Sequence, residues 1–207
     1  MAIDWTTLTA SKSTAGSIAN WVNRSDLPTE NILLEAEAWI YLKLRCREML
    51  IRDTAFQFDS GSQSEALPSG FLDPLGFWPY GYTDPLLYVH EEILEEQRDS
   101  DGTLLSGTPS RWAVIGETAY VDVQCSANYP GVLMYYKQPD ALSASNETNF
   151  LTRRYPSLLR MACMAHAYEH MKDTPRAREY LGLAMAKLEE ARQADDLFRR
   201  TQNAPAY

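Results

Sequence analysis

Cysteine is scarce in this sequence, and the cysteines that occur are not paired. Cys46, Cys125 and Cys163 are the only three among 207 residues, and no two of them form a CxxC motif. This odd and scattered set predicts free thiols in a reducing compartment, because a disulfide framework or a zinc ribbon needs cysteines at paired spacings.

Long apolar runs and an excess of basic residues are missing as well. No segment approaches the roughly 20 apolar residues that a membrane helix needs, and the N-terminus lacks the basic and apolar regions of a secretory signal. The 19 lysines and arginines stand against 28 acidic residues, which gives a formal net charge of −9. Because tight non-specific binding of nucleic acid depends on cations at the phosphates, this balance argues against such binding. We expect a soluble protein that is made in the cytoplasm and has no membrane partner.

The motifs that carry common enzyme chemistry are also absent from the sequence. There is no Gly-x-Ser-x-Gly elbow and no glycine-rich loop followed by Lys and then Ser or Thr. His90, His166 and His170 are the only histidines, which restricts the catalytic dyads that the chain can build. We therefore predict a non-enzymatic protein without a cofactor.

One pattern keeps an enzyme as the alternative. Cys163, His166 and His170 stand at positions i, i+3 and i+7, which share one face of a predicted helix and suit the ligands of a zinc ion. However, Ala167 follows His166, where the helical motif of zinc proteases has a glutamate. We expect an ordinary helix face without a metal, and a small metal-dependent hydrolase is the alternative.

Two helical zones flank a β-rich zone. Apolar residues recur at helical spacing over residues 15–21 and 30–47 in the first zone, and over 149–172 and 175–200 in the last. Pro156 is expected in the first turns of its helix or at a bend. The three residues 172–174 leave room only for an antiparallel helical hairpin between the last two helices.

Between these zones, short apolar and alternating segments predict strands. They cover residues 55–58, 86–89, 112–115, 119–124 and 132–136, with a short helix over 90–97. Turns are expected at Gly116-Glu117 and at Tyr129-Pro130-Gly131. The predicted fold class is α+β, with an N-terminal helical pair, a small antiparallel β element and a C-terminal antiparallel helical hairpin. We expect one domain over 1–207, which is helical in 1–50, β-rich with long loops in 51–140, and a helical hairpin with a C-terminal tail in 141–207.

Two groups of side chains predict surfaces. Segment 76–82, expected to be a loop, carries four aromatic residues that form either an interface with a neighbouring subunit or tail component, or a small core over the sheet. These residues are Phe77, Trp78, Tyr80 and Tyr82. A basic group in an acidic chain contacts either DNA phosphates or an acidic partner, or else forms surface or intersubunit salt bridges. It consists of Arg153, Arg154 and Arg160.

The order and spacing of several short motifs resemble those of the head-to-tail adaptor proteins of tailed bacteriophages. These motifs are residues 66–72 (ALPSGFL), 87–92 (LYVHEE), 112–116 (WAVIG), 119–123 (AYVDV), 132–139 (VLMYYKQP) and 141–159 (ALSASNETNFLTRRYPSLL). The similarity covers roughly the last two thirds of the chain. It departs from the family in residues 124–131 (QCSANYPG), where the adaptors have a turn with proline and aspartate.

The resemblance implies a virion structural protein at the head–tail junction. Such adaptors look like subunits of a ring, often dodecameric, that sits below the portal, seals the packaged DNA and offers the tail its binding surface. Packaged DNA then passes through the lumen without sequence-specific binding. For this chain the resemblance also implies a portal-binding end made of Leu197, Phe198, Arg199, Arg200, Pro205 and Tyr207. Another neck or tail-completion ring protein, and a bacterial interaction module without a phage role, are the alternatives.

Overall fold

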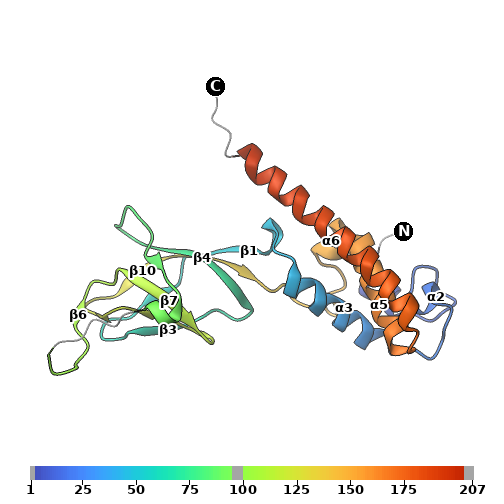
Figure 1. Ribbon diagram of the computed structural model, residues 1–207, viewed down its shortest axis with the longest axis horizontal. Coiled ribbons are helices and arrows are strands. Elements are labelled where there is room, and N and C mark those ends of the chain that lie inside the picture. Colours follow the sequence, from blue (N-terminus) through green and yellow to red (C-terminus); the bar gives the residue numbers. More distant parts are fainter. Residues whose placement is uncertain (1–2, 95–99, 203–207) are drawn as a thin grey trace. The chain divides into compact units, whose positions relative to one another are not determined.

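The computed structural model describes residues 3–94 and 100–202 (Figure 1). Contacts between Cα atoms divide the chain into two compact units. The helical unit comprises Met1–Glu48 and Pro139–Tyr207, and the β unit comprises Met49–Gln138. The β unit is therefore an insertion between two halves of the helical unit. That the two units together act as a single adaptor domain stays a prediction.

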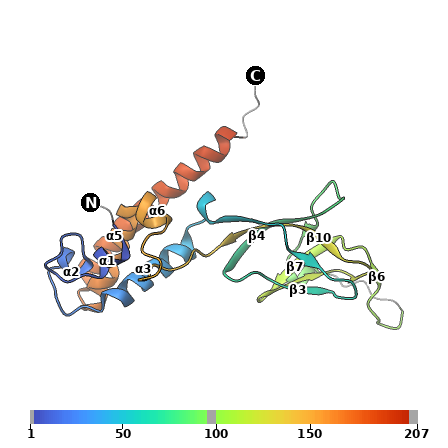
Figure 2. The ribbon, with the colours of Figure 1, turned by 180° about the vertical axis from the view of Figure 1, so that it is seen from behind.

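The described residues of the helical unit form six α-helices (Figure 2). They are α1 (Trp5–Thr9), α2 (Ile18–Trp21), α3 (Thr29–Lys43), α4 (Phe150–Arg154), α5 (Pro156–His170) and α6 (Thr174–Gln202), and the 3₁₀-helix η1 (Arg47–Met49) follows α3. The shortest helices rely on their caps, because a helix of one or two turns has little stability of its own. The Asp4 side chain accepts a hydrogen bond from the Thr7 N–H at 2.7 Å, and Asn149 forms a capping box with Thr152.

Helix α5 is the centre of the helical unit. It packs against α3, α6, α4 and α2, so Leu159, Ala162 and Cys163 are at most 1% exposed. The stacked rings of Tyr168 and Tyr180, whose centroids are 5.3 Å apart, add to the contact between α5 and α6. Among the described residues, no helix combines the length and the apolar character that crossing a membrane requires.

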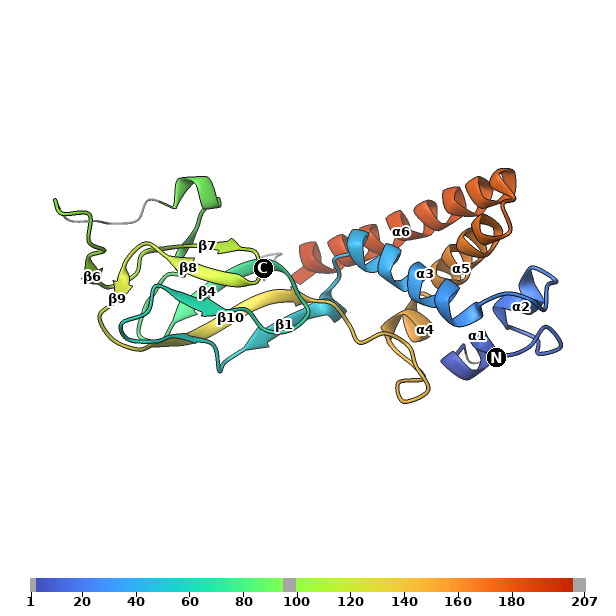
Figure 3. The same ribbon diagram turned by 90° about the horizontal axis from the view of Figure 1, so that it is seen from below.

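The β unit contains two four-stranded sheets and one strand pair (Figure 3). In the first sheet, β10 (Tyr129–Lys137) pairs antiparallel with β1 (Leu50–Asp53), β2 (Gln57–Phe58) and β4 (Phe71–Pro79). The second sheet has the order β3 (Ser64–Ala66), β8 (Thr118–Val121), β7 (Arg111–Ile115) and β5 (Leu87–Tyr88), and β5 runs parallel to β7. Strands β6 (Ser106–Gly107) and β9 (Gln124–Cys125) form a parallel pair, and the 3₁₀-helix η2 covers Glu91–Ile93.

Side chains from both four-stranded sheets share one hydrophobic core. Phe58, Phe77 and Leu133 come from the first sheet, and Trp112 and Val121 from the second. At its centre, the rings of Phe56, Phe58 and Phe77 meet edge to face, with centroids 5.4 to 5.5 Å apart. Edge-to-face pairs place the positive ring edge on the negative ring face, and they contribute roughly 0.5 to 1.5 kcal/mol each beyond simple burial.

The predicted fold class is wrong. Three α-helices precede the β unit and three follow it among the described residues, instead of an N-terminal pair and a C-terminal antiparallel hairpin. The strands build three sheets with two parallel pairings, instead of one small antiparallel element. The sequence did not reveal these elements because helices of four or five residues and strands of two residues are too short to show a clear periodic pattern. Capping stabilises the short helices, and pairing with other strands stabilises the short strands.

Four local predictions need correction as well. The single helix expected over 149–172 is two helices, since α4 ends at Arg154 and α5 begins at Pro156. Proline lacks the N–H that would continue the first helix. The turn expected at Tyr129-Pro130-Gly131 is the start of β10, and the loop expected from Gly76 to Pro79 is the end of β4. The short helix expected over 90–97 is reduced to η2 in the described residues, and 95–99 lie outside them.

Replacing Gly131 with alanine is expected to lower the stability of the β unit by about 1 to 3 kcal/mol. The new Cβ would lie 2.5 Å from the carbonyl oxygen of Trp78 and 2.6 Å from the Phe77 ring, so backbone would have to move. Gly107→Ala is the matched control, because no described atom beyond its two chain neighbours lies within 4 Å of its Cβ position. Urea denaturation followed by tryptophan fluorescence measures both. Equal stability of the two variants would contradict the tight approach of β4 to β10.

Candidate functional site

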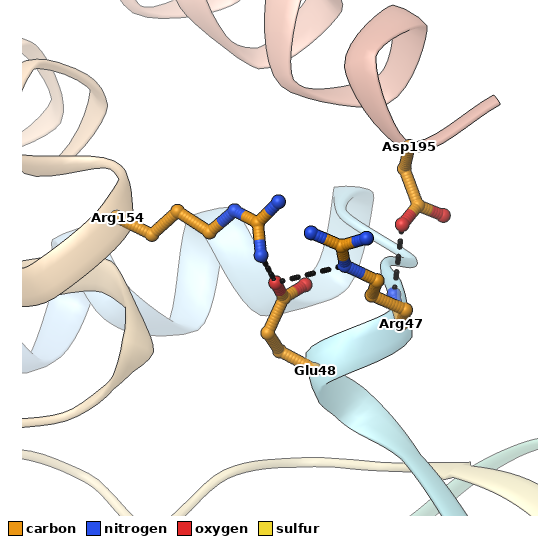
Figure 4. Close-up of polar contacts among 4 residues, drawn as sticks. All are labelled: Arg47, Glu48, Arg154 and Asp195. Carbon is orange, nitrogen blue, oxygen red and sulfur yellow. Dashed lines mark hydrogen bonds and ion pairs between the residues drawn. The ribbon is translucent and has the colours of Figure 1, made fainter. Parts of the chain in front are cut away.

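The second half of α6 is attached to the segment that follows α3 (Figure 4). The Arg47 backbone N–H donates to Oδ1 of Asp195 at 3.1 Å, and Asp195 is only 5% exposed. The Arg192 guanidinium donates to the carbonyl oxygen of Lys43. Because hydrogen bonds to charged groups are stronger than neutral ones, these two contacts fix α6 against the end of α3.

A second set of charged contacts lies beside this attachment. Glu48 Oε1 accepts a hydrogen bond from Arg154 Nη1 and lies 3.3 Å from Nε of Arg47 (Figure 4). Glu48 thereby joins α4 to η1, and its side chain is 19% exposed. Water screens an ion pair less at such partly buried positions than on an open surface.

Helix α6 continues beyond these contacts. It has 29 residues, whereas its neighbour α5 has 15, and its last turns extend past α5 (Figures 1 and 2). The predicted portal-binding residues Leu197, Phe198, Arg199 and Arg200 belong to these turns, although their side chains are outside the described part. Pro205 and Tyr207 lie outside the described residues altogether. Portal binding by this end stays a prediction.

Two of the three arginines in the predicted basic group have partners inside the helical unit. Arg154 pairs with Glu48, as a salt-bridge interpretation expects. The Arg160 guanidinium lies 5.1 Å from the centroid of the Trp21 ring, and Arg153 is exposed on α4. Contact of these arginines with DNA or an acidic partner stays a prediction.

The four aromatic residues of segment 76–82 divide into core and surface. Phe77 is fully buried in the core of the β unit, whereas the Tyr80 and Tyr82 side chains are 54% and 41% exposed. Trp78 is half-buried, and its ring lies over Gly76. The structure therefore brings Phe77 to the core and leaves the two tyrosines for a surface role, which no contact in the described residues tests.

Sequence reasoning missed an exposed apolar surface on α3. Leu34 and Leu42 are 48% and 75% exposed, and Ala38 lies between them at helical spacing. A shallow, open groove includes part of this surface. It is lined by Glu35, Ala38, Trp39 and Leu42 of α3 and by His166, Glu169 and His170 of α5. One feature of the sequence could have revealed this surface: α3 carries apolar residues on all sides, more than a helix needs to bury a single face.

The structure gives Cys163 a different environment from the two histidines, because Cys163 is buried whereas His166 and His170 line the groove. Cys163 is fully buried among the packed helices, and burial raises the pKa of its thiol well above the ordinary value. His166 instead approaches carboxylates, with Nδ1 3.5 Å from Glu169 and 3.9 Å from Glu35. Among the described residues, no three His, Cys, Asp or Glu side chains are placed to hold one metal ion.

All three cysteines are buried and free, which confirms the predicted free thiols. Burial raises the pKa of the Cys46 thiol to about 12 and of the Cys125 thiol to about 11. Desolvation disfavours the charged thiolate. These side chains therefore act as small apolar groups in the two cores.

A buried polar network joins α3 to the segment through which the chain returns to the helical unit. Glu37, 1% exposed, accepts hydrogen bonds from the Leu142 N–H at 2.9 Å, the Tyr41 hydroxyl at 3.0 Å and the Asn149 amide at 2.6 Å. Burial raises the pKa of the Glu37 carboxyl, and these bonds lower it in part. The network fixes residues 142–149 against α3, so Asn149 is positioned to cap α4.

Comparison with known proteins places these features in a family. A comparison with curated proteins gives no significant match. The family model of the SU10 adaptor protein matches residues 9–206. That match includes both halves of the helical unit and the whole β unit, so it depends on no single motif. The chain therefore belongs to the SU10 adaptor protein family, a family of phage head–tail adaptors.

Proposed function

We propose that this phage adaptor forms a ring at the head–tail junction of the virion, where it docks on the portal, extends the DNA channel and gives the tail its attachment surface. The observation that carries the proposal is the family match over residues 9–206. A bacterial interaction module without a phage role disagrees with this match.

The last turns of α6 are the proposed portal contact. The bonds of Arg192 and Asp195 hold α6 to the rest of the helical unit just before these turns, so the end of the helix is presented from a fixed base. Its sequence, Leu197-Phe198-Arg199-Arg200, combines apolar and cationic side chains. Aromatic residues and arginine are enriched among the residues that dominate binding energy at protein interfaces.

The charge of the chain suits a channel through which DNA passes. A formal net charge of −9 makes non-specific attraction to phosphates weak. In this proposal the ring is held together by apolar and polar contacts between proteins, and DNA moves through the lumen without base readout.

Removing Leu197–Tyr207 is expected to weaken association with the cognate portal ring by at least about 100-fold, as expected when the main anchors of an interface are lost. Truncation after Asp196 keeps the contacts of Asp195 and Arg192, so circular dichroism should show an intact helical unit. Native mass spectrometry of portal mixed with either protein measures the number of bound copies. The exposed substitution Arg52→Glu in the β unit is the control.

Two outcomes would contradict parts of this proposal. If the truncated chain binds portal as tightly as the full chain, docking through the end of α6 is wrong. We also expect the isolated chain to be monomeric or weakly associated, because the portal provides the template for the ring. Stable rings in solution without portal would contradict that template role.

A further inference from the structure

The helical unit carries two different exposed surfaces on opposite sides of α5. Arg160 and Glu169 are both exposed on this helix. Their separation of nine positions is about two and a half turns at ~3.6 residues per turn, which places them on opposite faces. The structure therefore separates the surface around Arg160 from the groove beside Glu169.

The groove on one side is apolar and acidic. Leu42 and Trp39 supply apolar surface from α3, and Glu35 and Glu169 border the groove with side chains that are 66% and 76% exposed. His166 and His170 also line the groove, and Nδ1 of His166 lies 3.5 Å from Glu169 and 3.9 Å from Glu35. Lys43 adds a cation, whose Nζ lies 5.7 Å from the Trp39 ring. An exposed apolar surface rimmed by charges is typical of a protein contact.

The opposite surface is cationic and aromatic. The Arg160 guanidinium is held over Trp21 at 5.1 Å, which restricts the arginine before any partner arrives. Arginine and tryptophan are frequent anchors of protein interfaces, and a preorganised side chain loses less conformational entropy on binding. The charge and the aromatic surface of this site complement the acidic, apolar groove.

We infer that the groove of one copy binds the Arg160–Trp21 surface of the next copy, so that these two surfaces form the contact between neighbours in the ring. A closed ring needs such a heterologous contact, in which one surface meets a different surface of the neighbour. The occupant is thus a second copy of this chain. The inference depends on the proposed ring, and it names the residues that hold the neighbours together.

Charge reversal provides the test, because each copy contributes both surfaces. The groove variant carries Glu35→Arg and Glu169→Arg, and the surface variant carries Arg160→Glu. Each alone places like charges at every contact, so at least about ten-fold fewer complete rings should form on the cognate portal. An equal mixture restores opposite charges at every contact of an alternating ring, so ring formation should return to near the level of the unaltered chain.

Matched controls separate the surfaces from net charge. Glu117→Arg with Glu179→Arg changes the net charge as the groove variant does, and Arg52→Glu matches the surface variant; all three positions are exposed. Both controls should form rings as the unaltered chain does. Native mass spectrometry counts the copies on each portal, and thermal melts verify folding of every variant.

The outcomes distinguish this inference from the proposed function. If the reversed variants form rings as the controls do, or fail alone and also in the mixture, the neighbour contact is wrong while the adaptor ring stands. If the groove variant forms normal rings but no longer binds tail components, the groove serves the tail instead. If the unaltered chain does not load onto the portal, the proposed function fails, and this contact fails with it.

Discussion

Replacing Glu37 with alanine is expected to lower the free energy of unfolding of the helical unit by roughly 3 to 5 kcal/mol. The substitution leaves the Leu142 N–H without its acceptor and removes one partner each from Tyr41 and Asn149. A buried donor without an acceptor costs about 1 to 3 kcal/mol, and the missing side chain leaves a cavity. Urea denaturation followed by circular dichroism at 222 nm reports on the helices.

The pH dependence gives this prediction a second measurement. Because burial raises the pKa of Glu37 above its ordinary value of 4.5, the folded protein binds this proton more tightly than the unfolded chain. The stability that this protonated carboxyl contributes is fully present below pH 4.5 and is lost as the pH rises through the raised pKa of Glu37. Glu37→Gln should remove this part of the pH dependence. If the two proteins show identical curves of stability against pH, the carboxyl is not buried as described.

Replacing Phe77 with alanine is expected to destabilise the β unit by roughly 3 to 5 kcal/mol, the usual cost of removing a buried aromatic side chain. The Phe77 ring is fully buried and contacts Phe56 and Phe58 at the centre of the core. The neighbouring backbone of β4 and β10 is paired on both sides of this position, so the cavity cannot collapse easily. Tryptophan fluorescence during urea denaturation, to which Trp78 and Trp112 contribute from the β unit, measures the loss.

Tyr80→Ala is the matched control for this prediction. The Tyr80 side chain is 54% exposed, and its hydroxyl donates a long hydrogen bond of 3.3 Å to the Thr54 carbonyl oxygen. We expect less than about 1 kcal/mol of destabilisation, as for most surface substitutions. If Phe77→Ala kept full stability and lowered only assembly with neighbouring copies, Phe77 would belong to an interface rather than to the core.

Long elements with strong periodic patterns were predictable from the sequence. The segments 30–47 and 175–200 correspond to α3 and α6, with ends shifted by a few residues. The strands β7 and β10 also lie where β-branched and aromatic residues gather. In each case one face of the element is buried against its neighbours, and the spacing of apolar residues along the sequence shows that face directly.

Elements that depend on distant partners were not predictable. Leu87–Tyr88 becomes a strand because Leu87 and Tyr88 pair with Arg111 and Trp112, and two residues carry no periodicity of their own. Strands β6 and β9 depend on each other in the same way. Non-local pairing of this kind is determined by the tertiary fold.

The candidate surfaces were likewise predictable only in part. The sequence placed Arg160 at a surface, but its stacking on Trp21 joins residues from helices far apart in the chain. The groove between α3 and α5 could not be predicted without knowing that Leu42 faces away from the core. An all-round apolar helix is compatible with complete burial or with a partner, and only the packing distinguishes the two.

The insertion of the β unit has a consequence for synthesis on the ribosome. Helix α3 is made before residues 49–138, whereas its packing partner α5 is made after them. The β unit can therefore fold as a complete unit while Ile32, Leu33 and Ile40 of α3 still lack their partner helix. Apolar surface exposed in this way promotes aggregation of nascent chains. The interval between synthesis of α3 and of α5 is thus the stage at which this apolar surface of α3 lacks its cover.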